Sequence, residues 1–83
     1  MQKSIYTAEY GIFLKLLRDA REKAGITQTD AADKMRTTQS YVSKCERGER
    51  RLDIVELKDW CDALGLSFAK FAAEFDKAVS KKR

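Results

Sequence analysis

The sequence predicts an all-α fold, a compact domain of five helices. Apolar residues recur at helical spacing along most of the 83 residues, and the chain contains no proline that would interrupt a helix. Three of its four glycines, Gly25, Gly48 and Gly65, end such apolar series, and a residue of the N-capping type follows each within a few positions. The connections are short, so we expect one domain over residues 1–83.

The first two helices are predicted from capping residues and from the apolar series between them. Thr7 is a suitable N-cap for a helix whose apolar side chains continue at helical spacing to Ala24, and Gly25 ends it. Thr27 caps a second helix over Gln28–Met35, with an acidic residue three positions after the cap.

A third helix follows after a very short connection. Thr38 is its N-cap, the helix runs from Gln39 to about Arg47, and Gly48 ends it. Residues 27–48 therefore form two short helices separated by a tight turn.

The last two helices carry the clearest apolar faces. Asp53 caps a fourth helix with Glu56 at the third position, and Gly65 closes it. Ser67 caps the fifth helix, and we expect its basic end, residues 77–83, to fray. The apolar face of the fifth helix consists of Phe68, Phe71, Ala72, Phe75 and Val79.

Composition excludes several classes of function. The chain has no histidine, and its two cysteines, Cys45 and Cys61, lie on apolar helix faces and form no C-x-x-C pair. We therefore expect buried thiols, no metal site, no cofactor and no enzymatic activity. No apolar run approaches the roughly 18–20 residues that span a bilayer, and no signal peptide is visible, so we expect a cytoplasmic protein without a membrane partner.

Charge is unevenly placed around a net value of +4. Residues 36–51 carry five basic and two acidic side chains, whereas residues 53–76 carry six acidic and two basic ones. Such a distribution gives the molecule one positive side suited to phosphates. Chance placement of surface charges can also produce an imbalance of this size in segments of this length.

The helix from Gln39 separates polar from apolar residues. At about 100° per residue, Val42 and Cys45 face one side. The opposite side carries Gln39, Ser40, Ser43, Lys44 and Arg47, with no carboxylate. The carboxamide, hydroxyls and cations of these side chains suit the edges of DNA bases, but an ordinary solvated helix face has the same composition.

The spacing of these residues resembles a known family. Thr27-Gln28, Ala32, Thr38-Gln39-Ser40 and Ser43-Lys44-x-Glu46-Arg47-Gly48 are similar to the lambda-repressor-like helix-turn-helix family, which includes phage repressors and Cro proteins. The resemblance extends from about Leu14 to Leu66. It implies the lambda repressor-like DNA-binding fold, with the helix from Gln39 in the major groove of double-stranded DNA.

The resemblance also implies roles for single residues. A partly buried, structural salt bridge would join Arg21 and Glu46. Gln28 would also support Gln39, and Tyr41 would either reach a phosphate or cover the edge of the core. The base contacts would be Gln39, Ser40, Ser43 and Lys44. The phosphate contacts would be Gln28, Arg36, Tyr41, Arg47, Arg50 and Arg51.

One position departs from the family pattern. Arg36 stands in the turn where the family usually has glycine, because the chain needs a left-handed residue there. We expect either a left-handed arginine, at a cost of about 1–2 kcal/mol, or a turn of different shape.

Members of this family usually bind palindromic operators as dimers, so we expect a homodimer. The candidate interface residues are Leu52, Trp60, Phe68, Phe71 and Phe75, although the aromatic ones also suit a small core. The favoured function is a transcriptional regulator that represses its genes. The alternative is a protein-interaction module, such as the antitoxin of a toxin–antitoxin pair, or a restriction-modification controller protein.

Overall fold

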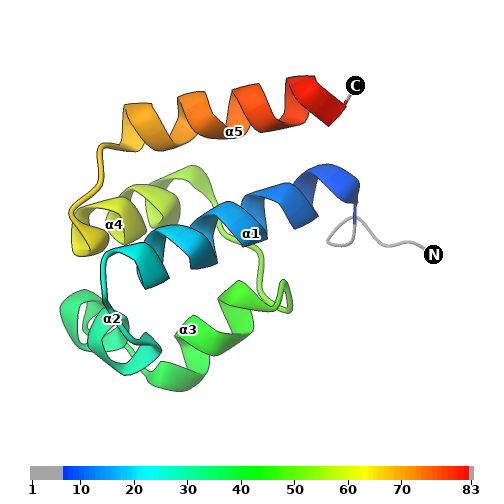
Figure 1. The fold of residues 1–83 in the computed structure, drawn as a ribbon. Coiled ribbons are helices and arrows are strands. Elements are labelled where there is room, and N and C mark those ends of the chain that lie inside the picture. The colour runs from blue at the N-terminus through cyan, green and yellow to red at the C-terminus, as the bar shows by residue number, and fades with distance from the viewer. Residues whose placement is uncertain (1–6, 83) are drawn as a thin grey trace.

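The computed structural model describes residues 7–82, which form five helices and, within that range, no strand (Figure 1). The predicted all-α, five-helix fold is confirmed. The elements are α1 (Ala8–Lys23), α2 (Gln28–Met35), α3 (Gln39–Glu46), α4 (Ile54–Leu64) and α5 (Phe68–Lys82).

Each helix begins where a side-chain oxygen accepts a hydrogen bond from the third helical amide. The five capping residues are Thr7, Thr27, Thr38, Asp53 and Ser67. Two of the caps are reciprocal, because Asp30 accepts from the Thr27 amide at 3.2 Å and Glu56 accepts from the Asp53 amide at 2.9 Å. These bonds pair amides that the first helical turn leaves without partners, so local sequence sets the helix starts.

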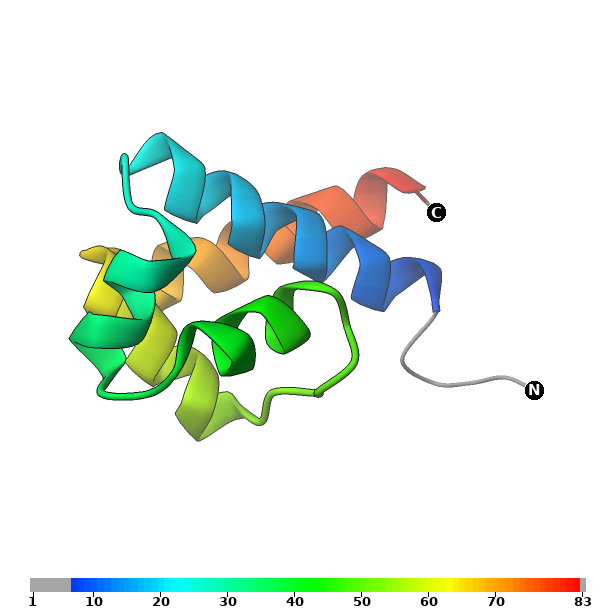
Figure 2. The ribbon, with the colours of Figure 1, turned by 90° about the horizontal axis from the view of Figure 1, so that it is seen from below.

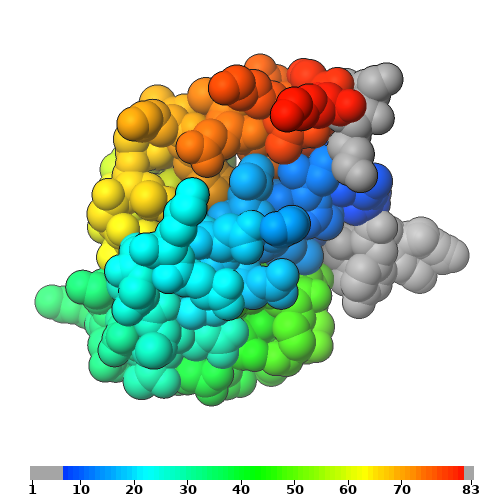
Figure 3. Space-filling model, viewed as in Figure 1, coloured from blue at the N-terminus to red at the C-terminus, as the bar shows by residue number. Residues whose placement is uncertain are grey.

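The helices pack in a way that leaves α2 and α3 at one end of the molecule. α1 contacts α5 on one side and α3 on the other, while α4 packs on α2 and α5. Figure 1 shows α5 above α1, with α2 and α3 below, and Figure 2 shows α3 and the following loop from that lower side. In the space-filling view, α2 and α3 make up most of the lower end of the molecule (Figure 3).

The core lies where all five helices meet. Trp60 and Phe71, expected as candidate interface residues, belong to it: Trp60 is only 1% exposed, and Phe71 packs edge-on against Phe13 at a centroid distance of 6.0 Å. Large aromatic side chains supply much of the apolar area that so short a chain can bury, which explains their place inside. The buried apolar cluster consists of Phe13, Leu17, Ala31, Ala32, Val42, Cys45, Trp60, Cys61, Leu64 and Phe71.

The basic end of the chain, which we expected to fray, belongs to α5 as far as residue 82. Val79 is buried there, and Ala78 lines a hollow together with Ile12 and Leu16 of α1, so the last turns of α5 have an apolar side toward the rest of the fold. Tertiary contact of this kind stabilises helix ends that capping alone does not hold.

Candidate nucleic-acid interface

α3 has one buried side and one side open to solvent. Val42 and Cys45 are fully buried, and burial raises the pKa of the Cys45 thiol. On the opposite side, three of four polar residues are exposed and Ser43 is half-buried. The polar face, as we call it below, consists of Gln39, Ser40, Ser43 and Lys44.

Gln39 does not project freely from this face. Its Nε2 donates a hydrogen bond of 2.6 Å to Oε1 of Gln28, which lies at the first position of α2. Nε2 of Gln28 donates in turn to Oε1 of Glu46 at 3.0 Å. Gln28 therefore links the first residue of α3 to the last.

Glu46 also holds Arg21 of α1, so the expected ion pair is present. Arg21 donates from Nε to Oε2 of Glu46 at 2.5 Å and from Nη2 to Oε1 at 3.0 Å, and its Nη1 donates to the Ile26 carbonyl at 2.9 Å. The two side chains are 9% and 3% exposed. The hydrogen bonds to Glu46 raise the pKa of Arg21. A pair this buried fixes α1 against α3.

The turn between α2 and α3 is left-handed at Arg36, with φ 59° and ψ 46°. The Thr37 amide donates to the Ala32 carbonyl at 2.9 Å, and the Arg36 amide donates to the Asp33 carbonyl at 3.2 Å. These two bonds form the Schellman pattern that usually carries glycine. Of the two expected geometries, the left-handed arginine is the one found, and Arg36 is the only non-glycine residue with positive φ among those the structure describes.

Two of the arginines expected at phosphates are paired with carboxylates within the chain. Arg47 donates to Glu49 and to the Ser43 hydroxyl, and the hydrogen bond from Arg47 lowers the pKa of the Glu49 carboxyl. Arg50 donates to Glu56 at 2.6 Å and lies 5.2 Å from the centre of the Tyr41 ring. Any phosphate would have to compete with these carboxylates.

The remaining cations are placed differently. Arg51 lies over the ring of Tyr10 at 4.2 Å, a contact that leaves the charge itself uncompensated. Lys44 and Arg36 are exposed, and neither forms an ion pair with any residue between 7 and 82. These two side chains are the most available to an approaching anion.

The two acidic partners, Glu49 and Glu56, were not predicted from the sequence. Glu49 is two residues from Arg47, so their proximity was visible in the chain. Glu56 lies six residues from Arg50 across the loop that precedes α4, and no local pattern signals that contact.

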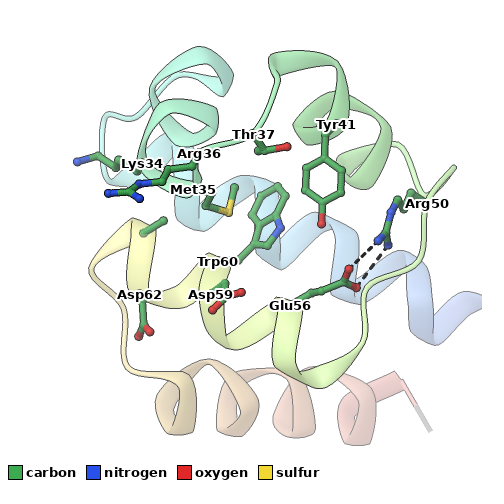
Figure 4. A pocket seen from close by; sticks show the side chains of 11 residues that line it. Lys34, Met35, Arg36, Thr37, Tyr41, Arg50, Glu56, Asp59, Trp60 and Asp62 are labelled. Atoms are coloured by element: carbon green, nitrogen blue, oxygen red, sulfur yellow. Dashed lines mark hydrogen bonds and ion pairs between the residues drawn. The ribbon is translucent and has the colours of Figure 1, made fainter.

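A groove of about 680 Å³ lies beside the turn, between α2, α3 and α4 (Figure 4). Trp60 rises from α4 between Met35 and Tyr41, and its buried Nε1 has no hydrogen-bond partner among residues 7–82. Burial raises the pKa of Tyr41 to about 12. The described residues contain no cluster of three or more side chains suited to a metal ion.

A second groove, of about 400 Å³, contains the other candidate interface residues. Leu52, Phe68 and Phe75 are half-buried and line it, where α1, α4 and α5 meet. Ile54 and Val55, at the start of α4, are 67% and 68% exposed. Sequence reasoning missed this pair, although two adjacent apolar residues in a helix rarely both face the core. Within residues 7–82, no helix is long and apolar enough to span a bilayer.

Comparison with known proteins gives one family. A family model described as a helix-turn-helix, HTH_3, matches residues 17–71. This span includes all of α2, α3 and α4 and the polar face. No curated protein sequence matches the chain.

Several solved structures share the fold. An XRE-family like protein from Pseudomonas syringae pv. tomato is 39% identical, with a TM-score of 0.81, over 90% of this chain and 94% of that one. The restriction-modification controller protein C.Esp1396I is 26% identical, with a TM-score of 0.84, over 93% of this chain and 100% of that one. The clp gene regulator ClgR from C. glutamicum is 28% identical, with a TM-score of 0.75, over 87% and 94%.

Proposed function

The chain belongs to the helix-turn-helix family HTH_3, and on that basis we propose that it is a sequence-specific DNA-binding transcriptional regulator. The observation that carries the proposal is the division of α3. Its apolar side is fixed in the core, and its exposed side offers a carboxamide, hydroxyls and an ammonium group without a carboxylate. A rigid helix with such an edge suits the major groove, where these groups distinguish base pairs.

We assign two kinds of DNA contact, one to base edges and one to phosphates. The polar face contacts base edges, with Gln39 and Lys44 the main contributors. Phosphate contacts position the helix in the groove but carry no sequence information. The residues we assign to phosphates are Gln28, Arg36, Tyr41, Arg47, Arg50 and Arg51.

A single α3 reaches only a few base pairs, so we propose that two copies bind a palindromic operator. The exposed Ile54 and Val55, beside the groove lined by Leu52, Phe68 and Phe75, form the surface we assign to the second copy. Analytical ultracentrifugation of Val55→Lys tests this assignment by its sedimentation coefficient. Ala73→Lys is the matched control, because Ala73 is an exposed residue of α5 outside that groove. Only Val55→Lys should sediment as a monomer; equal behaviour of both variants contradicts the surface.

Repression follows most simply from such binding, because an occupied operator excludes polymerase. A second candidate function is that of a restriction-modification controller, which the likeness to C.Esp1396I favours. An antitoxin that holds a toxin is the remaining alternative. A neighbouring restriction-modification or toxin gene in the genome would separate these roles, all of which are compatible with operator binding.

Selection of bound sequences from a randomised DNA pool tests the proposal. We expect an enriched palindrome whose half-sites are about one helical turn apart. Gln39→Ala and Lys44→Ala should then lose preference for the selected site, whereas Arg51→Ala should weaken binding to every sequence and reduce the salt dependence. Absence of any enriched sequence would contradict sequence-specific binding.

A further inference from the structure

We propose that Tyr10 of α1 is a positioning residue for Arg51, which it holds in place for contact with a DNA phosphate. The effect on DNA binding rests on the proposed function. The order of the Arg51 side chain, in contrast, is a property of the protein without DNA and is tested without DNA.

Tyr10 contacts the loop after α3 in two ways. The guanidinium carbon of Arg51 lies over its ring, 4.2 Å from the centre, and its hydroxyl oxygen accepts a hydrogen bond of 3.2 Å from the Leu52 amide. The ring is itself held against the buried Phe13, with a centroid distance of 5.2 Å. One side chain of α1 therefore connects this loop to the core.

The peptide unit between Arg51 and Leu52 is held by side chains at both of its polar groups. Its carbonyl accepts a hydrogen bond from Nη1 of Arg50 at 2.6 Å, and its amide donates to Tyr10. Neither group has a backbone partner within residues 7–82. A loop segment without such bonds would be mobile, so these two contacts fix the point from which the Arg51 side chain leaves the backbone.

Arg51 is held without a carboxylate, unlike its neighbours. Arg47 and Arg50 each pair with a glutamate, whereas the face of the Tyr10 ring attracts the guanidinium of Arg51 without neutralising its charge. No N–H of the Arg51 side chain donates a hydrogen bond within residues 7–82. Its donors therefore remain for a phosphate, which a guanidinium can bind through two parallel hydrogen bonds.

The loop lies on the same side of the molecule as α3 (Figure 2). An arginine that contacts a phosphate loses rotamer freedom, and the contact with Tyr10 removes part of that freedom before DNA binds. Loss of the Tyr10 ring should therefore weaken binding to every sequence, by about fivefold. The ratio of affinities for the selected site and for unrelated DNA should stay the same, because phosphates carry no sequence information.

The first experiment is nuclear magnetic resonance of the chain without DNA. Protons of a guanidinium over an aromatic ring are shifted upfield by the ring current, so we expect this shift for the side-chain Nε–H and δ protons of Arg51. Tyr10→Phe keeps the ring and should keep the shift, while the Leu52 amide should exchange faster with solvent. Tyr10→Leu should lose the shift. Free-arginine values in the wild-type chain would overturn the proposal, even if Tyr10→Leu fails to fold.

The second experiment asks whether Tyr10 affects DNA binding through Arg51. Tyr10→Leu alone should weaken binding to all sequences about fivefold, but should change the affinity little when it is added to Arg51→Ala. Tyr10→Phe should bind nearly as tightly as the wild type. Ile12→Ala is the matched control and should leave the affinity unchanged, since Ile12 is a half-buried residue of α1 that lines a different hollow, beside Ala78.

Equal losses from Tyr10→Leu with and without the Arg51 side chain would overturn the positioning role. Tyr10 also lines the groove that we assign to the second copy, so the sedimentation of Tyr10→Leu is measured as well. A Tyr10→Leu chain that sediments as a monomer would place its effect on assembly and would likewise contradict the proposal. If the wild-type chain binds no DNA, the proposed function fails, while the resonances of Arg51 still decide whether Tyr10 orders it.

Discussion

Arg47, the C-cap of α3, and Glu49 are joined by two hydrogen bonds, of 2.9 and 3.2 Å. Pairing with Glu49 raises the pKa of Arg47, and both side chains are about half exposed. Arg47, one of the cations that we assign to phosphates, is therefore already paired with a carboxylate in the free protein. A phosphate must displace the carboxylate before it gains this contact.

Removal of that competitor should strengthen DNA binding. Glu49→Gln frees Arg47 and deletes one negative charge near the polar face, so we expect tighter binding to all sequences. The slope of log affinity against log salt should steepen by about 1. Glu74→Gln, an exposed acid on α5 at the other end of the molecule, is the matched control and should leave both unchanged. Equal slopes for the two variants would show that Arg47 contacts no phosphate.

Substitution of Arg36 by glycine should stabilise the turn between α2 and α3. Its left-handed backbone, with φ 59°, costs an L-residue about 1–2 kcal/mol that glycine avoids. Arg36→Gly should raise the free energy of unfolding by about 1 kcal/mol in urea titrations, after the greater chain entropy of glycine is subtracted. Arg36→Ala retains the strain and should gain nothing. A less stable glycine variant would mean that the arginine side chain itself stabilises the turn.

The Arg21–Glu46 pair should be costly to break but cheap to replace. Glu46→Ala leaves a buried guanidinium without its carboxylate and should lower the free energy of unfolding by about 3–5 kcal/mol. The double variant Arg21→Met with Glu46→Leu removes both charges and should lose much less. Guanidinium or urea denaturation of the three chains measures the difference. A double variant as unstable as Glu46→Ala would contradict this account of the pair.

Tyr41 should lower the stability of the fold as the pH rises above 10. Burial raises its pKa from 10.0 to about 12, so the folded state keeps a proton that the unfolded state has released. Stability from this group is complete below pH 10 and is lost as the pH rises toward 12. The free energy of unfolding should therefore fall less steeply between pH 10 and 12 in Tyr41→Phe than in the wild type. Identical slopes would place the Tyr41 hydroxyl in free contact with solvent.

Helix boundaries were predictable because their signals are local. Thr27 and Asp53 carry both halves of a reciprocal cap within four residues, and the structure contains those bonds. The left-handed geometry of Arg36 was one of two expectations, and only the backbone decides between them. The Arg21–Glu46 contact came from family resemblance alone, since residues 25 positions apart leave no trace in local periodicity.

Tertiary packing decides where the sequence left two roles open. Trp60 and Phe71 suited either an interface or a small core, and five helices leave one central space, which these rings fill. Within the basic segment 77–82, Val79 is buried against the rest of the fold, a contact that the charge pattern does not signal. The pairing of Arg50 with Glu56 depends on the path of the loop before α4, which composition does not specify.

The residues of the polar face differ in how freely they can be substituted over evolutionary time. Ser40 and Lys44 are exposed and donate to no other side chain of residues 7–82, so their replacement leaves the interior intact. Gln39 is tied through Gln28 to Glu46. Under the proposed base contacts, substitution at Ser40 and Lys44 would change the preferred operator and leave the fold as before, whereas a new residue at Gln39 would have to be accommodated at Gln28 as well.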